Sequence, residues 1–170
     1  MERIGTKANW TESIERMSSM NEKKPCGERS DDTELLKGIY QDAKMGEETL
    51  KTLLKTIDSG QIKSDLQAQA AGYAEFYGKA QKELAKLHAD PEEVGPLTKA
   101  SSYLGVKMNA MLDSSPSHVA EMTIQGSTMG IVSTTESLNK HPDAGREAKR
   151  LANDVLAFEQ ENIERMKAYL

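Results

Sequence analysis

Three glutamates far apart in the sequence have the chemistry of metal ligands. Glu47 lies in line with the apolar residues of one helical pattern, Glu121 precedes Met122 in another, and Glu159 follows Phe158 in a third. Carboxylates that face inward from several helices are how a helical bundle builds a two-metal site. Because burying them without a partner is costly, such a site would need a metal ion, iron or manganese, or hydrogen-bond partners. We expect the glutamates to lie at the edge of the core with ordinary hydrogen bonds, as most glutamates do, and bound iron or manganese is the alternative.

Histidine spacing argues against the usual version of such a site. A di-iron bundle uses Glu-x-x-His twice, which places a carboxylate and an imidazole one turn apart on the same face. None of His88, His118 and His141 follows a glutamate by three positions, and His118-x-x-Glu121 has the reverse order. No Ser/His/Asp or Cys/His arrangement supports nucleophilic catalysis either, and the single cysteine, Cys26, lies among polar residues. We therefore expect a protein that is not an enzyme.

Two glycines, Gly126 and Gly130, interrupt the stretch EMTIQGSTMGIVS at residues 121–133. A phosphate-binding loop would need a different spacing, a lysine and a preceding strand. Glycine inside a helix costs roughly 1 kcal/mol relative to alanine, so an interior glycine usually has a packing or functional reason. Small residues one turn apart allow a neighbouring helix to approach closely. The sequence therefore predicts close helix packing at both glycines.

Four long helices are predicted to carry these residues. Apolar side chains recur every three or four positions over about 31–58, 62–88, 116–140 and 143–170, and glycine or proline separates these stretches. No stretch shows the alternation of a strand. A shorter amphipathic stretch at about 97–112 suits a crossover, because a short loop could only return the chain antiparallel. We expect an all-α fold, an up-down-down-up four-helix bundle in which this stretch is a short crossover helix.

The first thirty residues differ from the rest. Residues 1–30 combine a short amphipathic stretch around Trp10 with the polar run NEKKPCGERS, which predicts a flexible N-terminal arm and linker before a bundle over 31–170. A docked N-terminal helix is the alternative, and Met17 and Met20 are alternative start positions. The run SDDTE then supplies oxygens suited to the N-cap of the first long helix.

Composition excludes several classes of protein. A net charge of −5 gives no support to nucleic-acid binding, which needs a clustered basic surface. No run approaches the roughly 18 apolar residues of a membrane span. The first residues contain no apolar stretch of the kind found in a signal peptide. We expect a cytoplasmic protein with no nucleic-acid or membrane partner.

Three segments resemble an uncharacterised group of small bacterial ferritin-like proteins. They are IYQDAKMGEETLKTLL, AEMTIQGSTMGI and FEQENIERMKAYL, and the resemblance covers roughly residues 31–170. It implies a ferritin-like bundle in which the first and third helices each supply a carboxylate. By position, Glu47 or Glu48 matches the carboxylate of the first helix, and Glu121 or Gln125 matches the carboxylate of the third helix.

The other two helices of a metal-binding ferritin-like protein each supply Glu-x-x-His. Here Glu159-x-x-Asn162 resembles the final motif with asparagine in place of histidine. The second helix offers Gln69 and tyrosines in place of the motif. The resemblance therefore implies that the scaffold is kept and that the di-iron chemistry is mostly lost.

These observations lead to two functional expectations. The first is a non-enzymatic bundle without a cofactor that acts as a homodimer or through a protein partner, because its third long helix is apolar on nearly all sides. The apolar residues of that helix are Val119, Met122, Ile124, Met129, Ile131, Val132 and Leu138. The second is an iron- or manganese-binding or redox protein with a carboxylate, amide and tyrosine site in its core.

Overall fold

The computed structural model describes residues 26–58, 60–91 and 115–170. The expected crossover helix and most of the expected N-terminal arm lie outside these residues. The described helices are α2 (Cys26–Leu53), α3 (Gln61–Lys86), α5 (Pro116–Lys140) and α6 (Arg146–Met166), followed by the short 3₁₀ helix η2 (Lys167–Tyr169). This part of the chain contains no strand, and the prediction of an all-helical protein is confirmed.

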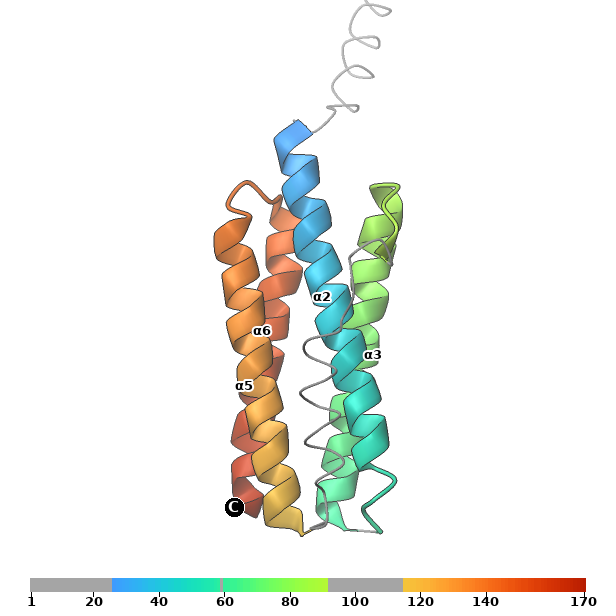
Figure 1. Ribbon diagram of the computed structural model, residues 1–170, viewed down its shortest axis with the longest axis vertical. Coiled ribbons are helices and arrows are strands. Elements are labelled where there is room, and N and C mark those ends of the chain that lie inside the picture. Colours follow the sequence, from blue (N-terminus) through green and yellow to red (C-terminus); the bar gives the residue numbers. More distant parts are fainter. Residues whose placement is uncertain (1–25, 59, 92–114) are drawn as a thin grey trace, which may run out of the picture.

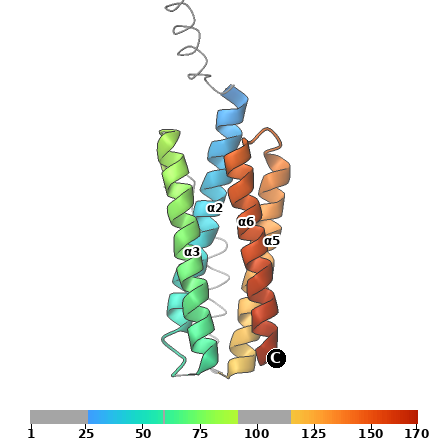
Figure 2. The same cartoon turned by 180° about the vertical axis from the view of Figure 1, so that it is seen from behind.

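The four helices lie side by side in two layers. α2 and α5 face the viewer in Figure 1, and α3 and α6 face the viewer in Figure 2. α2 packs mainly on α3, and α5 mainly on α6, with further contacts between the two pairs. α2 and α6 run from the top to the bottom of Figure 1, whereas α3 and α5 run from the bottom to the top. None of the described helices is long and apolar enough to cross a membrane.

The interior of the bundle is filled by the apolar faces of the helices. Two apolar clusters fill the interior, one built around Leu35, Leu84 and Leu151 and the other around Leu53, Leu66 and Met166. Their residues recur at three- and four-residue steps, which places them on one face of each helix. The predicted helix over 116–140 is found with those bounds.

The start of α2 differs from the prediction. The helix begins at Cys26, directly after a proline in the sequence, and not at the SDDTE run. Asp31 and Asp32 therefore lie inside the helix, where their carboxylates accept hydrogen bonds from the backbone N–H groups of Asp143 (3.1 Å) and Gly145 (2.5 Å). The acidic run therefore caps the beginning of α6 and not the beginning of α2. Its position in the sequence did not show which of the two helices it caps.

Candidate functional site

A cluster of polar side chains lies inside the bundle. Gln69 and Tyr73 come from α3, Ser127 from α5, and Glu159 and Asn162 from α6, and all five residues are buried. The Tyr73 hydroxyl donates to both carboxylate oxygens of Glu159, at 2.9 and 2.8 Å. The Gln69 amide donates to the Ser127 hydroxyl at 3.3 Å. Three helices are thus joined through hydrogen-bonded side chains in an otherwise apolar core.

Helix geometry explains why these residues meet. Residues three or four apart lie on the same helix face, so Gln69 and Tyr73 share one face of α3, and Glu159 and Asn162 share one face of α6. On α5, the lack of a side chain at Gly130 provides the space for the Glu159 carboxylate. A Cβ atom there would lie 2.6 Å from Glu159 Oε1 and 3.1 Å from its Cδ.

Burial dominates the electrostatics of the cluster. It raises the pKa of Glu159 to about 7, and the nearby charge of Asp42 acts in the same direction, while hydrogen bonds with Tyr73 and Ser127 act against it. The pKa of the Tyr73 hydroxyl is also raised, mainly by burial and secondly by the charge of Glu159. At neutral pH the cluster therefore contains a neutral tyrosine beside a carboxyl group close to its midpoint of titration.

A second carboxylate lies on α2. Asp42 is partly buried, and its Oδ2 accepts a hydrogen bond of 2.6 Å from the Ser133 hydroxyl on α5. Burial raises the pKa of Asp42, and the hydrogen bond from Ser133 opposes that rise. Asp42 and Glu159 therefore influence each other across the space between their helices.

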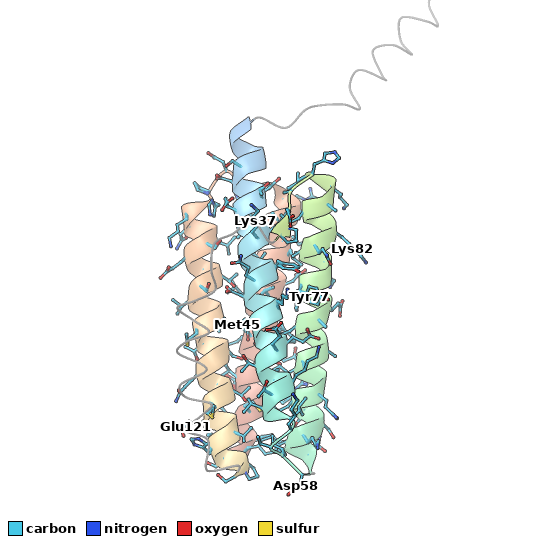
Figure 3. The ribbon with its side chains drawn as sticks, turned by 45° about the vertical axis from the view of Figure 1, so that its right-hand side comes forward. Lys37, Met45, Asp58, Tyr77, Lys82 and Glu121 are labelled. Atoms are coloured by element: carbon cyan, nitrogen blue, oxygen red, sulfur yellow. The ribbon has the colours of Figure 1, made fainter. Side chains whose placement is uncertain are left out.

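That space is a cavity of about 260 Å³ lined by all four described helices. Its apolar walls include Met45, Leu50, Leu53, Met122 and Met129. Figure 3 shows Met45 midway along α2. The lining of α2 runs from Asp42 to Leu53, so the cavity extends from the middle of α2 to its last turn.

Most polar groups of the cavity belong to the hydrogen-bonded residues described above. They are Asp42, Ser133, Gln69, Tyr73, Ser127 and Glu159, and two threonines, Thr49 and Thr123, complete the polar lining among the described residues. A mostly apolar concavity with a few converging polar groups is the general form of a small-molecule site.

Two buried amide atoms in the described core lack a hydrogen-bond partner, Gln69 Oε1 and Asn162 Nδ2. Because α3 and α6 run in opposite directions (Figure 1), both residues lie one turn beyond the Tyr73–Glu159 pair, toward the same end of the bundle. An unsatisfied buried polar atom costs about 1–3 kcal/mol. Such atoms mark a place where a further polar group is missing.

The three glutamates expected to bind a metal are not brought together. Glu47 is half-buried and forms an ion pair of 2.7 Å with Lys51 on its own helix. The Glu121 side chain is 61% exposed and lies 3.9 Å from His118, near the lower end of α5 in Figure 3. Only Glu159 lies in the core, and the described residues contain no group of three His, Cys, Asp or Glu side chains arranged to hold a metal ion.

The helix register explains these misplacements. Gly46 lines the cavity, and each residue turns about 100° from the one before it, so Glu47 points past the cavity. The alternatives at these two positions, Glu48 and Gln125, are both exposed. Hydrophobic spacing locates the buried face of a helix only to within about one residue. A difference of one residue is enough to decide whether a glutamate faces the core.

The two glycines of α5 have different surroundings. The close approach expected at Gly130 is made by the Glu159 side chain of α6. A Cβ atom added at Gly126 would meet no described atom within 4 Å, and this residue lines the cavity instead. Two further close approaches were not expected: a Cβ atom added at Gly46 would lie 2.9 Å from the ring of Tyr73, and one added at Gly72 would overlap the ring of Phe158.

The sequence did not indicate Asp42 or Ser127 as site residues. The helical spacing of Met122, Gly126, Met129 and Ser133 predicts one face of α5 as its seam, whereas the buried stripe consists of Val119, Ala120, Thr123, Ser127 and Thr134. Small polar residues at regular three- and four-residue steps carried that signal. Because these residues are not hydrophobic, the search for regularly spaced apolar side chains did not detect this buried face.

Comparison of the chain with protein-family models, with curated proteins and with solved structures gives no match.

Proposed function

We propose that this protein is a non-enzymatic ferritin-like four-helix bundle that binds a small molecule in the cavity between its helices. The observation that carries the proposal is the cavity of about 260 Å³, whose walls are apolar and whose polar groups come from all four described helices. Its volume is near the lower end for ligand sites, which suits a small ligand.

The ferritin-like part of the proposal concerns topology. The directions of the helices in Figure 1, with α2 and α6 opposed to α3 and α5, support an up-down-down-up order. Such an order requires a long connection between the second and third helices, and residues 92–114 provide the length.

Binding is favoured over nucleophilic catalysis by the absence of a nucleophile–base pair from the described lining. His118 lies in the first turn of α5, and His141 caps the end of the same helix. Neither lines the cavity, and its described lining contains no cysteine or lysine. Its titratable groups are two carboxyl groups and a buried tyrosine whose pKa is raised, and all three can form hydrogen bonds with a ligand.

The proposal is tested with three probes that share one aliphatic chain: hexylamine, hexan-1-ol and hexanoate. Titrations followed by NMR of the methionine methyl groups should show binding of at least one probe, because three methionines line the cavity. Gly126→Leu should abolish that binding, since its side chain would extend into the cavity. Gly78→Leu is the matched control, because Gly78 also has open space around its Cβ position but does not line the cavity.

Two outcomes would overturn the proposal. One is that none of the three probes shifts the methionine signals. The other is stoichiometric iron, manganese or zinc in protein purified from metal-supplemented medium, which would favour the expected metal-binding function.

A further inference from the structure

The charge of the cavity indicates the class of its ligand. Its titratable groups are Asp42 on α2, Tyr73 on α3 and Glu159 on α6, and α5 contributes only neutral groups among its described residues. No lysine, arginine or histidine is present in the described lining. Among the described residues, the cavity therefore has two carboxyl groups and no basic side chain that would balance their charge.

The hydrogen-bonding groups have the same bias. Glu159 and Asp42 are acceptors when ionised, and Gln69 Oε1 is a buried acceptor without a donor. The present donors to the two carboxylates are the hydroxyl groups of Tyr73 and Ser127, which contact Glu159, and of Ser133, which contacts Asp42. Acceptors thus exceed donors around the cavity, and a ligand rich in N–H groups would correct the imbalance.

A cation would also offset the cost of burying Glu159. The side chain is 3% exposed, and an ionised carboxylate in such a place is unfavourable unless it is paired. An opposite charge within hydrogen-bond distance removes much of that penalty. A neutral ligand would not do so, and an anion would increase the penalty.

The walls indicate what else the ligand carries. Leucine side chains and flexible methionine thioethers suit an aliphatic body of adaptable shape. A hydrated metal ion would leave these apolar walls in contact with water.

Building on the proposed binding function, we propose that the cavity takes a small organic ammonium ion, with its N–H groups directed at Glu159 and Asp42 and its aliphatic chain against Met45, Met122 and Met129. A primary ammonium has three N–H donors, enough to contact both carboxylates at once.

The three matched probes test this inference when their affinities are compared at about pH 8, where the carboxylates are ionised. Hexylamine should bind most tightly, hexan-1-ol more weakly and hexanoate least. Glu159→Gln and Asp42→Asn should each weaken hexylamine binding by about tenfold and leave hexan-1-ol binding nearly unchanged. Glu121→Gln is the matched control, because it removes an exposed carboxylate outside the cavity.

Each other outcome has a defined meaning. Equal or tighter binding of hexan-1-ol or hexanoate would overturn the ammonium inference and leave the binding function in place. Unchanged hexylamine affinity in both Glu159→Gln and Asp42→Asn would also overturn the ammonium inference and leave the binding function in place. Displacement of hexylamine by Mn²⁺ at a concentration below that of hexylamine would overturn the ammonium inference in favour of a metal ion. If none of the three probes binds, both proposals are overturned.

Discussion

At the scale of single residues, Glu159 makes stability depend on pH. Its pKa rises from 4.5 to about 7 on folding because the side chain is buried. The folded protein therefore holds a proton that the unfolded chain has lost between these two values. The contribution of this group is fully present below pH 4.5, falls as the pH rises and is lost above about pH 7.

Glu159→Gln should remove this dependence. The neutral amide keeps the shape of the side chain and can still accept a hydrogen bond from Tyr73. The variant should be more stable than the wild type at about pH 8, by up to roughly 3 kcal/mol for a shift of this size, and similar to it at about pH 5. Urea unfolding across this range measures the difference.

Glu121→Gln serves as the control, because this exposed side chain should leave the profile unchanged. Asp42, whose pKa is also raised by burial, should give Glu159→Gln some remaining pH dependence of the same sign. A Glu159→Gln variant that is less stable than the wild type at about pH 8 would contradict this prediction, because it would show that the folded protein stabilises the ionised carboxylate.

At the scale of the helix, α5 carries two glycines four residues apart with opposite surroundings. Gly130→Ala would place a methyl group against the Glu159 carboxylate, which Tyr73 holds in position. Gly126→Ala would extend into open space within the described structure. Substitution by alanine should therefore change the stability of the protein in opposite directions at the two glycines.

We expect Gly130→Ala to destabilise the protein by about 1–3 kcal/mol, the usual cost of overpacking. We expect Gly126→Ala to stabilise it by up to about 1 kcal/mol through helix propensity. Melting temperatures of the two variants provide the comparison. A destabilised Gly126→Ala variant would restore the original expectation that a neighbouring segment lies close to this glycine.

At the scale of the whole molecule, the expected association stays a prediction. α5 does not bury all of its apolar residues, since Met129 is 44% and Val132 is 52% exposed. Met129 also lines the cavity, so Val132 is the better position at which to test an interface.

If this face of α5 forms a homodimer, Val132→Glu should dissociate it, because a charge buried in an apolar contact is costly. Val132→Leu should keep the dimer. Light scattering coupled to size-exclusion chromatography measures the mass of each form. A wild-type protein that is monomeric at every concentration would remove self-association through this face.

The sequence by itself determined the helices and most of the core. Helical spacing located α3 and α5 to within two residues at either end, because apolar periodicity and the breaks at Gly60 and Pro116 are local properties of the chain. It also placed Glu159 and Asn162 near the core, because their neighbours Val155 and Met166 lie on the same helix face. The bounds of the other two helices are less accurate: α2 runs from Cys26 to Leu53 where about 31–58 was expected, and α6 runs from Arg146 to Met166 where about 143–170 was expected. The acidic run expected to start α2 lies inside it and caps α6.

The tertiary structure alone decided which polar residues meet. Glu47 and Glu159 were equivalent candidates in the sequence, but a rotation of about 100° per residue directs Glu47 past the cavity, where it pairs with Lys51, and Glu159 into the interior. Tyr73 finds Glu159 across 86 positions of the chain, and Gly130 matters because of a side chain on another helix. Such pairings depend on how the helices are packed against one another, and periodicity within one helix does not contain that information.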